Sequence, residues 1–254
     1  MRWWSSSKRT RTVPSKLFPK PADWGKDPLS EFLDAAQSNT FATFVNKRGW
    51  FSKFVVLDQA FIKVITTISH EEDILFGLLL LRSHASFRSA CQLAMGGQCP
   101  ECFMVLRGCL EAALYALHIT EHPELGEIWL NRHTSADAEG RCRGEFAYGQ
   151  AKRTLEAKSK KYFDILTALY ERTIAFGAHP NERSVTGSLK KTQEGNRTEF
   201  SLAYLEGDTL QLNHILKTTA QIGACSLHIA QVAYPQRFAI LGLDKLLDSV
   251  THDI

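Results

Sequence analysis

The sequence predicts a mainly α-helical protein: an antiparallel helical bundle around a buried central helix, with one small β-hairpin. Most segments repeat apolar residues at intervals of three and four, the period of a helix that buries one face. Residues 99–122 are apolar on nearly every side, as expected of a helix inside a globule. A stretch at about 184–205 alternates with period two around a Gly-containing turn, which predicts the hairpin. Connections are mostly short, so neighbouring helices should run antiparallel.

Composition and charge are those of an ordinary globular protein. The 254 residues are 44% hydrophobic and carry a formal net charge of +3, which alone does not argue for nucleic acid. Six cysteines are scattered among helical segments, a pattern typical of reduced thiols. The longest apolar run, Ile74–Leu81, is far short of the about 20 residues that a membrane span needs. We therefore expect a cytoplasmic protein that does not contact a membrane.

The chain divides into a leader and a single domain. Residues 1–28 are expected to form a flexible basic N-terminal arm, because seven Lys or Arg stand against two Asp and no hydrophobic period is visible. Such an arm is most simply a solvated tail, with contact to RNA or to a partner as the alternative. Residues 29–254 are expected to form one helical-bundle domain.

The first helices follow from periodicity and glycine. Leu29–Val45 has a short helical pattern that Gly49 should end. Phe51–Ser69 places its large apolar residues on one face of a helix. The next helix should run from Ile74 to about Met95, where two glycines follow.

The central helix carries one narrow polar stripe, made of Arg107, Glu111 and His118. Buried unpaired charge is costly, so these groups should be paired. We expect Glu111 to pair with basic residues of the preceding helix, the candidates being Arg82, His84 and Arg88. Replacing Glu111 with alanine should then cost several kcal/mol, because a buried arginine would lose its counter-charge.

The middle of the chain is expected to change from helix to loop and back. A short piece at 124–133 precedes a polar, Gly-containing segment at 134–144, which we expect to be a loop. Residues 145–176 read as one long helix with a single skipped apolar position, at Ser159. Gly177 is well placed to end it.

The last third should contain the hairpin and two more helices. Val185 and Leu189 are expected in its first strand, and the second strand should carry Phe200, Leu202 and Tyr204. Helices at 209–234 and, after Pro235, at 238–250 complete the prediction.

Metal and redox chemistry find little support in the sequence. Cys99 and Cys102 form a CxxC at the expected start of the central helix, where a lowered thiol pKa would allow redox chemistry. No βαβ pattern surrounds this pair, and no second CxxC completes a zinc site. The paired Glu-x-x-His motifs of di-metal bundles are absent from the sequence. We therefore expect neither a metal nor a cofactor.

The most specific motif is the run from Arg172 to His179, in which six residues separate the arginine from the histidine. A long helix that ends in such an Arg–His motif resembles the HEPN superfamily, helical bundles of prokaryotic defence and toxin–antitoxin systems. Residues 104–117 and the helix–hairpin order also resemble uncharacterised bacterial helical proteins grouped with it. The resemblance covers roughly residues 75–230.

This resemblance implies a HEPN-like cytosolic protein of bacterial defence or toxin type that cleaves RNA without a metal ion. His179 would act as general base on the 2′-hydroxyl, and Arg172 would hold the scissile phosphate. Asn181 and Arg183 would add phosphate contacts. The resemblance also implies a homodimer and an antitoxin or other protein partner.

Two other interpretations stay open. In the structural one, His179 only closes the helix end and Arg172 pairs with a neighbouring carboxylate. In the other, the protein is a non-catalytic helical module that binds a partner protein or a small anionic ligand through Arg107, Glu111 and His118. Whether the protein is an enzyme is left open by the sequence.

Overall fold

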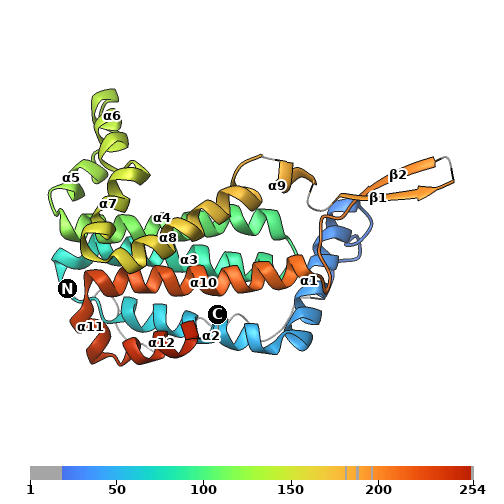
Figure 1. The fold of residues 1–254 in the computed structure, drawn as a ribbon, viewed down its shortest axis with the longest axis horizontal. Helices are drawn as coiled ribbons and strands as arrows, with labels where there is room; N and C mark the ends of the chain where they lie inside the picture. Colours follow the sequence, from blue (N-terminus) through green and yellow to red (C-terminus); the bar gives the residue numbers. More distant parts are fainter. Residues whose placement is uncertain (1–18, 181, 187–188, 196, 253–254) are drawn as a thin grey trace.

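The computed structural model describes residues 19–180, 182–186, 189–195 and 197–252, and it confirms a mainly α-helical fold with one antiparallel hairpin (Figure 1). The long helices are α1 (Pro28–Asn46), α2 (Arg48–Thr66), α3 (Ile74–Gly96), α4 (Cys99–Glu121) and α10 (Leu210–Ala233). The shorter helices are α5 (Leu125–Leu130), α6 (Ala136–Glu145), α7 (Tyr148–Lys158), α8 (Lys160–Thr173), α9 (Glu182–Thr186), α11 (Pro235–Ile240) and α12 (Leu243–His252). A 3₁₀ turn, η1 (Glu71–Asp73), precedes α3, and a π-helical turn, η2 (Ile174–Ala178), follows α8. Strands β1 (Leu189–Glu194) and β2 (Arg197–Leu202) form the hairpin.

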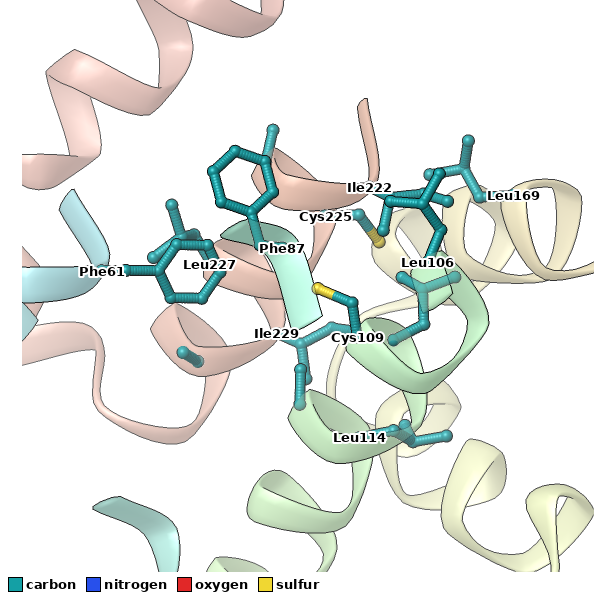
Figure 2. Close-up of a cluster of buried hydrophobic side chains, with 14 of the residues drawn as sticks. Phe61, Phe87, Leu106, Cys109, Leu114, Leu169, Ile222, Cys225, Leu227 and Ile229 are labelled. Atoms are coloured by element: carbon teal, nitrogen blue, oxygen red, sulfur yellow. The ribbon is translucent and has the colours of Figure 1, made fainter. Parts of the chain in front are cut away.

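Helix α4 is the centre of the bundle, as its sequence predicts. It packs along α3 and α10 and is also contacted by α7, α8 and η2. Figure 2 shows where α3, α4 and α10 meet, with Phe87 of α3, Cys109 of α4 and Leu227 of α10 in one cluster. Gly223 lets α10 approach α3 closely here, because a Cβ at that position would lie 2.5 Å from the Phe87 ring.

Within the described part of the chain, α4 is also the one helix long and apolar enough to span a membrane. Its most apolar window is 67% buried inside the fold. Apolar residues all round the helix are therefore accounted for by the neighbouring helices that cover it.

The long helix expected at 145–176 is interrupted at Ser159. The backbone of Ser159 is extended (φ −156°, ψ 100°), and its hydroxyl accepts a hydrogen bond from the Tyr162 backbone N–H. Serine is a favoured N-cap because its side chain satisfies such a donor. The interruption folds α7 back against α8, so that the Tyr148 and Tyr170 rings stack 3.7 Å apart.

Several other local expectations were wrong, and the single helix expected at 238–250 is divided between α11 and α12. The loop expected at 134–144 contains α6, which starts because the Ser135 side chain accepts from the Ala138 N–H. The break expected at Gly49 lies at Lys47, and Gly49 is inside α2. Val185 belongs to the short helix α9 and not to a strand, whereas Leu189 does begin β1, paired with Leu202.

The expected pairing of α3 with Glu111 is also wrong. His84 Nε2 and Arg88 Nε lie 2.7 and 2.6 Å from Asp58 Oδ1 of α2. His84 and Arg88 therefore tie α3 to α2, and the partners of Glu111 are Arg107 and Tyr170 instead.

Residues 1–18 of the predicted basic arm lie outside the described part. Just after them, Lys20 Nζ and Trp24 Nε1 donate to the two carboxylate oxygens of Asp34, at 2.6 and 2.8 Å. These contacts hold the segment that precedes α1 against the first half of that helix.

Candidate functional site

The candidate site is built on the exposed side of α4. Arg107 Nε donates to Glu111 Oε1 at 2.9 Å, one helical turn later. Arg107 Nη1 lies 3.5 Å from Nε2 of His179, which directly follows η2. The structure thus brings together one of the two predicted catalytic residues and two residues of the predicted polar stripe.

Tyr170 of α8 positions the Arg107–Glu111 pair. Its hydroxyl donates to Glu111 Oε1 at 2.8 Å, and the Arg107 guanidinium lies 5.1 Å from the centre of its ring. Burial and the hydrogen bond to Glu111 raise the pKa of Tyr170, which keeps the phenol protonated as a donor. The arginine is therefore fixed both by charge and by a cation–π contact.

The Arg107–Glu111 pair is more exposed than the sequence predicts. Each of the two side chains keeps 32% of its accessible surface. Water therefore screens the pair, and the expected cost of several kcal/mol for removing Glu111 is too large. The same exposure makes the guanidinium reachable by an anion from solvent.

The π-helical turn η2 determines where His179 goes. A Cβ on Gly177 would lie 2.1 Å from the carbonyl oxygen of Pro100, so only glycine lets this turn sit on the first turn of α4. The Phe176 ring stacks on Phe103 of α4 with centroids 5.5 Å apart. Single π-helical turns occur frequently at functional sites.

Arg172 faces a different helix from His179. Its Nη1 donates to Gln221 Oε1 at 2.6 Å and to the Thr218 hydroxyl at 3.3 Å, both on α10. Residues seven apart share one side of a regular α-helix, and the wider π turn between them explains why these two diverge. Burial lowers the pKa of Arg172, since its guanidinium has left part of its water shell.

His214 of α10 is a residue that sequence analysis missed. Its ring lies 5.1 Å from Phe176 and 6.0 Å from Phe103, measured between centroids. Its Nε2 atom is buried without a hydrogen-bond partner among the described residues. Burial and the nearby charge of Arg172 lower its pKa, so the ring is held neutral. No periodicity signal distinguishes this histidine from other positions of α10.

The remaining predicted site residues lie elsewhere or outside the described part. His118 is buried, with Nδ1 2.8 Å from the Thr154 hydroxyl and Nε2 3.2 Å from the Glu145 carbonyl oxygen. It therefore joins α4 to α6 and α7. Asn181 and the side chain of Arg183 are outside the described residues.

A row of cationic and aromatic groups leads away from Arg107 along the α7–α8 pair. Beyond the stacked Tyr170 and Tyr148, the Lys152 ammonium lies 5.3 Å from the Tyr148 ring and 5.0 Å from the Phe163 ring. Lys160 lies 4.2 Å from the Phe163 ring, and it also pairs with Asp164 and Glu156. We call these six residues the cation–aromatic row: Arg107, Tyr170, Tyr148, Lys152, Phe163 and Lys160.

The cysteine pair at the start of α4 is buried. Cys99 is 7% exposed and Cys102 is fully covered. Burial raises the pKa of the Cys99 thiol to about 12 and that of Cys102 further still. In the described part of the chain, no three His, Cys, Asp or Glu side chains are grouped so that they could hold a metal ion.

Fold and site together define a class: a mainly α-helical bundle in which helix α8 ends, through a π turn, in a histidine beside a half-buried arginine. Comparisons with protein-family models, with curated proteins and with solved structures found no match. Any function must therefore be argued from the site itself and from the motif resemblance.

Proposed function

We propose that this chain is a HEPN-like cytosolic protein of bacterial defence or toxin type that cleaves RNA without a metal ion. The observation that carries the proposal is the 3.5 Å approach of the Arg107 guanidinium to the His179 imidazole on an exposed surface. A proton acceptor beside a fixed cation is what cleavage of a phosphodiester by its own 2′-hydroxyl requires.

In this proposal His179 removes the proton from the 2′-hydroxyl of the nucleotide before the scissile bond. The 2′-oxygen attacks phosphorus, the bond to the 5′-oxygen breaks, and the leaving 5′-oxygen takes a proton from water. Arg107 donates to the phosphate oxygens on which negative charge builds up. Glu111 and Tyr170 hold that guanidinium in place before substrate arrives.

Arg172 would contribute only after a rearrangement. Its guanidinium is bonded to Gln221 and Thr218, so it must leave these partners to reach a phosphate beside His179. Neither partner is a carboxylate, so the bonds that must break are those of a charged donor to neutral acceptors. The motif resemblance further predicts a homodimer and an antitoxin or other protein partner.

The cation–aromatic row supports RNA as the substrate. Proteins that bind single strands use cations that track the backbone, and Arg107, Lys152 and Lys160 would supply them here. The Tyr170 ring is not open to a base, because it is 4% exposed and stacked on Tyr148. The row follows α8 from Lys160 to Tyr170, which is ten residue steps, or about 15 Å at the rise of an α-helix. A row of this length, ending at Arg107, would accommodate several nucleotides on one side of the scissile bond.

One observation favours a second candidate, a non-catalytic module that binds an anionic ligand or a partner protein. Arg172 and His179, the pair expected to act together, contact different helices. The exposed Arg107 alone would still attract a phosphate or carboxylate group.

A cleavage and binding experiment separates the two candidates. Purified protein is incubated with total RNA in EDTA, and the products are tested for the 2′,3′-cyclic phosphate ends that this chemistry leaves. His179→Ala should abolish cleavage, whereas His133→Ala, an exposed histidine outside the site, should not change it. Fluorescence anisotropy with a 2′-deoxy oligonucleotide measures binding in parallel. Binding without cleavage would replace the nuclease by the second candidate, with the nucleic acid as its anionic ligand. Neither cleavage nor binding would refute RNA as the substrate or ligand of this site.

A further inference from the structure

A cavity of about 390 Å³ lies between α1, α2 and α3, on the side of the bundle away from the candidate site. Its wall is formed by Thr40, Phe41 and Phe44 of α1, Phe51 and Phe54 of α2, and Cys91, Gln92 and Met95 of α3. Pockets for small molecules typically enclose about 300–1,000 Å³ and are lined mainly by apolar and aromatic side chains. The volume and the lining are therefore those of a small-molecule site.

The cavity arises from the way α1 packs. The buried residues of α1 are the small Ser30, Ala36 and Thr43, so this helix brings no large side chain between itself and α3. Where α1 passes into α2 at Lys47, the Phe44 and Phe51 rings pack edge to face with centroids 4.7 Å apart. These rings contact each other and leave the space beside them unfilled.

The interior of the cavity offers a ligand almost no hydrogen bond. Phe54 and Met95 are 3% and 4% exposed and form its deepest wall. The Thr40 hydroxyl already donates to the Ala36 carbonyl oxygen at 2.9 Å. Burial raises the pKa of the Cys91 thiol, which therefore stays uncharged. Because a buried polar group without a partner is costly, the part of a ligand that enters this cavity must be apolar.

The edge of the cavity carries a positive charge. The guanidinium carbon of Arg48 lies 4.0 Å from the centre of the Phe44 ring and 5.9 Å from that of Phe51, two rings of the wall. Arg48 is exposed, and within the described part of the chain no carboxylate pairs with it. The neighbouring Lys47 is neutralised by Asp208, at 2.6 Å. Arg48 is thus available to an anion that leaves the cavity at this edge.

We propose that the cavity binds a free carboxylate with an acyl chain, the chain among the phenylalanines and the carboxylate at Arg48. An apolar cavity of about 150 Å³ holds benzene, with six carbons, so one of about 390 Å³ has room for about 15 carbons. A cationic occupant, such as the basic residues 1–18, would set like charges together at Arg48. Apolar volume and unpaired charge therefore select a small anionic amphiphile.

The proposal does not depend on the proposed nuclease function. No residue of the cavity wall belongs to the candidate site around Arg107 and His179, so acyl binding and RNA cleavage can fail separately.

Calorimetric titration of the full-length chain with decanoate tests the cavity. One site per chain is expected, with a Kd in the micromolar range, and decanol, which has the same chain without the charge, should bind more weakly. Arg48→Glu should weaken decanoate binding about tenfold and leave decanol binding unchanged, because attraction at the edge becomes repulsion. Arg82→Glu, at an exposed arginine of α3 outside the cavity wall, is the matched control and should change neither.

Methionine methyl resonances locate the ligand in the unmodified protein. Met95 is in the wall of the cavity, whereas Met104 on α4 is 51% exposed and outside it. Decanoate should shift the Met95 methyl signal saturably and leave that of Met104 in place. Cys91→Phe, which puts a ring into the cavity, should abolish the binding of both decanoate and decanol, and circular dichroism checks that the variant keeps its helix content.

Vesicles of phosphatidylglycerol distinguish a free acyl carboxylate from the acyl chain of a membrane lipid. The proposal predicts that the chain stays in the supernatant when the vesicles are sedimented. Vesicle binding without decanoate binding would overturn the proposal, as would the absence of any decanoate binding. An Arg48→Glu variant that loses decanol as much as decanoate, or a shift of Met104 without one of Met95, would also overturn it.

Discussion

Replacing Gly177 with alanine should disturb both the fold and the candidate site. The added Cβ would lie 2.1 Å from the Pro100 carbonyl oxygen and 2.9 Å from the Phe103 Cβ. Both atoms belong to the start of α4, the most deeply packed helix, so neither can yield easily. The turn η2 must instead move outward by about 1 Å to relieve the contact.

The expected magnitude follows from this clash. Overpacking a well-filled interior costs about 1–3 kcal/mol, and the upper end applies here because the obstacle is backbone. For a protein of this size, each kcal/mol lowers Tm by about 2–4 °C, so we expect a fall of about 6–12 °C. His179 follows η2 directly, so its contact with Arg107 should be lost and any RNA cleavage should fall with it.

Thermal unfolding and RNA cleavage are measured on the same preparation. Gly140→Ala is the matched control, because a Cβ at Gly140 in α6 meets nothing within 4 Å. It should stabilise the protein by about 0.5–1 kcal/mol through helix propensity. A Gly177→Ala variant with unchanged Tm would refute the close packing of η2 on α4.

Three other predictions concern the charged pair, the histidines and the thiols. Glu111→Gln should lower the free energy of unfolding by about 1 kcal/mol, because it weakens the i,i+4 pair with Arg107 and the hydrogen bond from Tyr170. Urea unfolding measures this change. A decrease of more than about 3 kcal/mol would show that water does not screen the pair. Burial lowers the pKa of His84, His118, His214 and His228, so the unfolded chain binds more protons. The contribution of these neutral histidines to the free energy of unfolding should therefore be fully present above about pH 6.5 and be lost toward pH 5. A Tm that stays constant or rises from about pH 6.5 to pH 5 would contradict this prediction. Finally, the buried Cys99 and Cys102 should react with a thiol reagent only after unfolding, and rapid labelling of either in the native protein would be incompatible with their burial.

The sequence predicts the bundle well where apolar periodicity is long and unbroken. The central helix and α10 were found within one or two residues of their expected bounds, because a buried helix must keep its apolar residues in step over many turns. The hairpin was also found, since alternation is a local signal, but its strands lie closer to the turn than expected, and Val185 and Tyr204 fall outside β1 and β2.

Errors arose where one side chain decides the local structure. Ser159 divides α7 from α8 by capping the next helix, and Ser135 starts α6 in a segment too polar to show a period. The register of α3 against α2 was also invisible, because nothing in the sequence indicates that Asp58, rather than Glu111, faces His84.

The candidate site was predicted only in part for a similar reason. Spacing alone places Arg172 and His179 on one side of a regular helix. The π turn that separates them depends on Gly177 meeting Pro100, a contact between residues 77 positions apart. Arg107 was identified from its place in the polar stripe, but its approach to His179 follows only from the packing of η2 on α4.

Nuclear magnetic resonance of the labelled protein with a 2′-deoxy-substituted RNA oligonucleotide tests the central claim most directly. The ring signals of His179 and the Nε–H signal of Arg107 should shift together and saturably as RNA is added, because the phosphate occupies the space between the two side chains. RNA that shifts neither signal, or that shifts only signals far from α4 and η2, would contradict the assignment of this site to RNA.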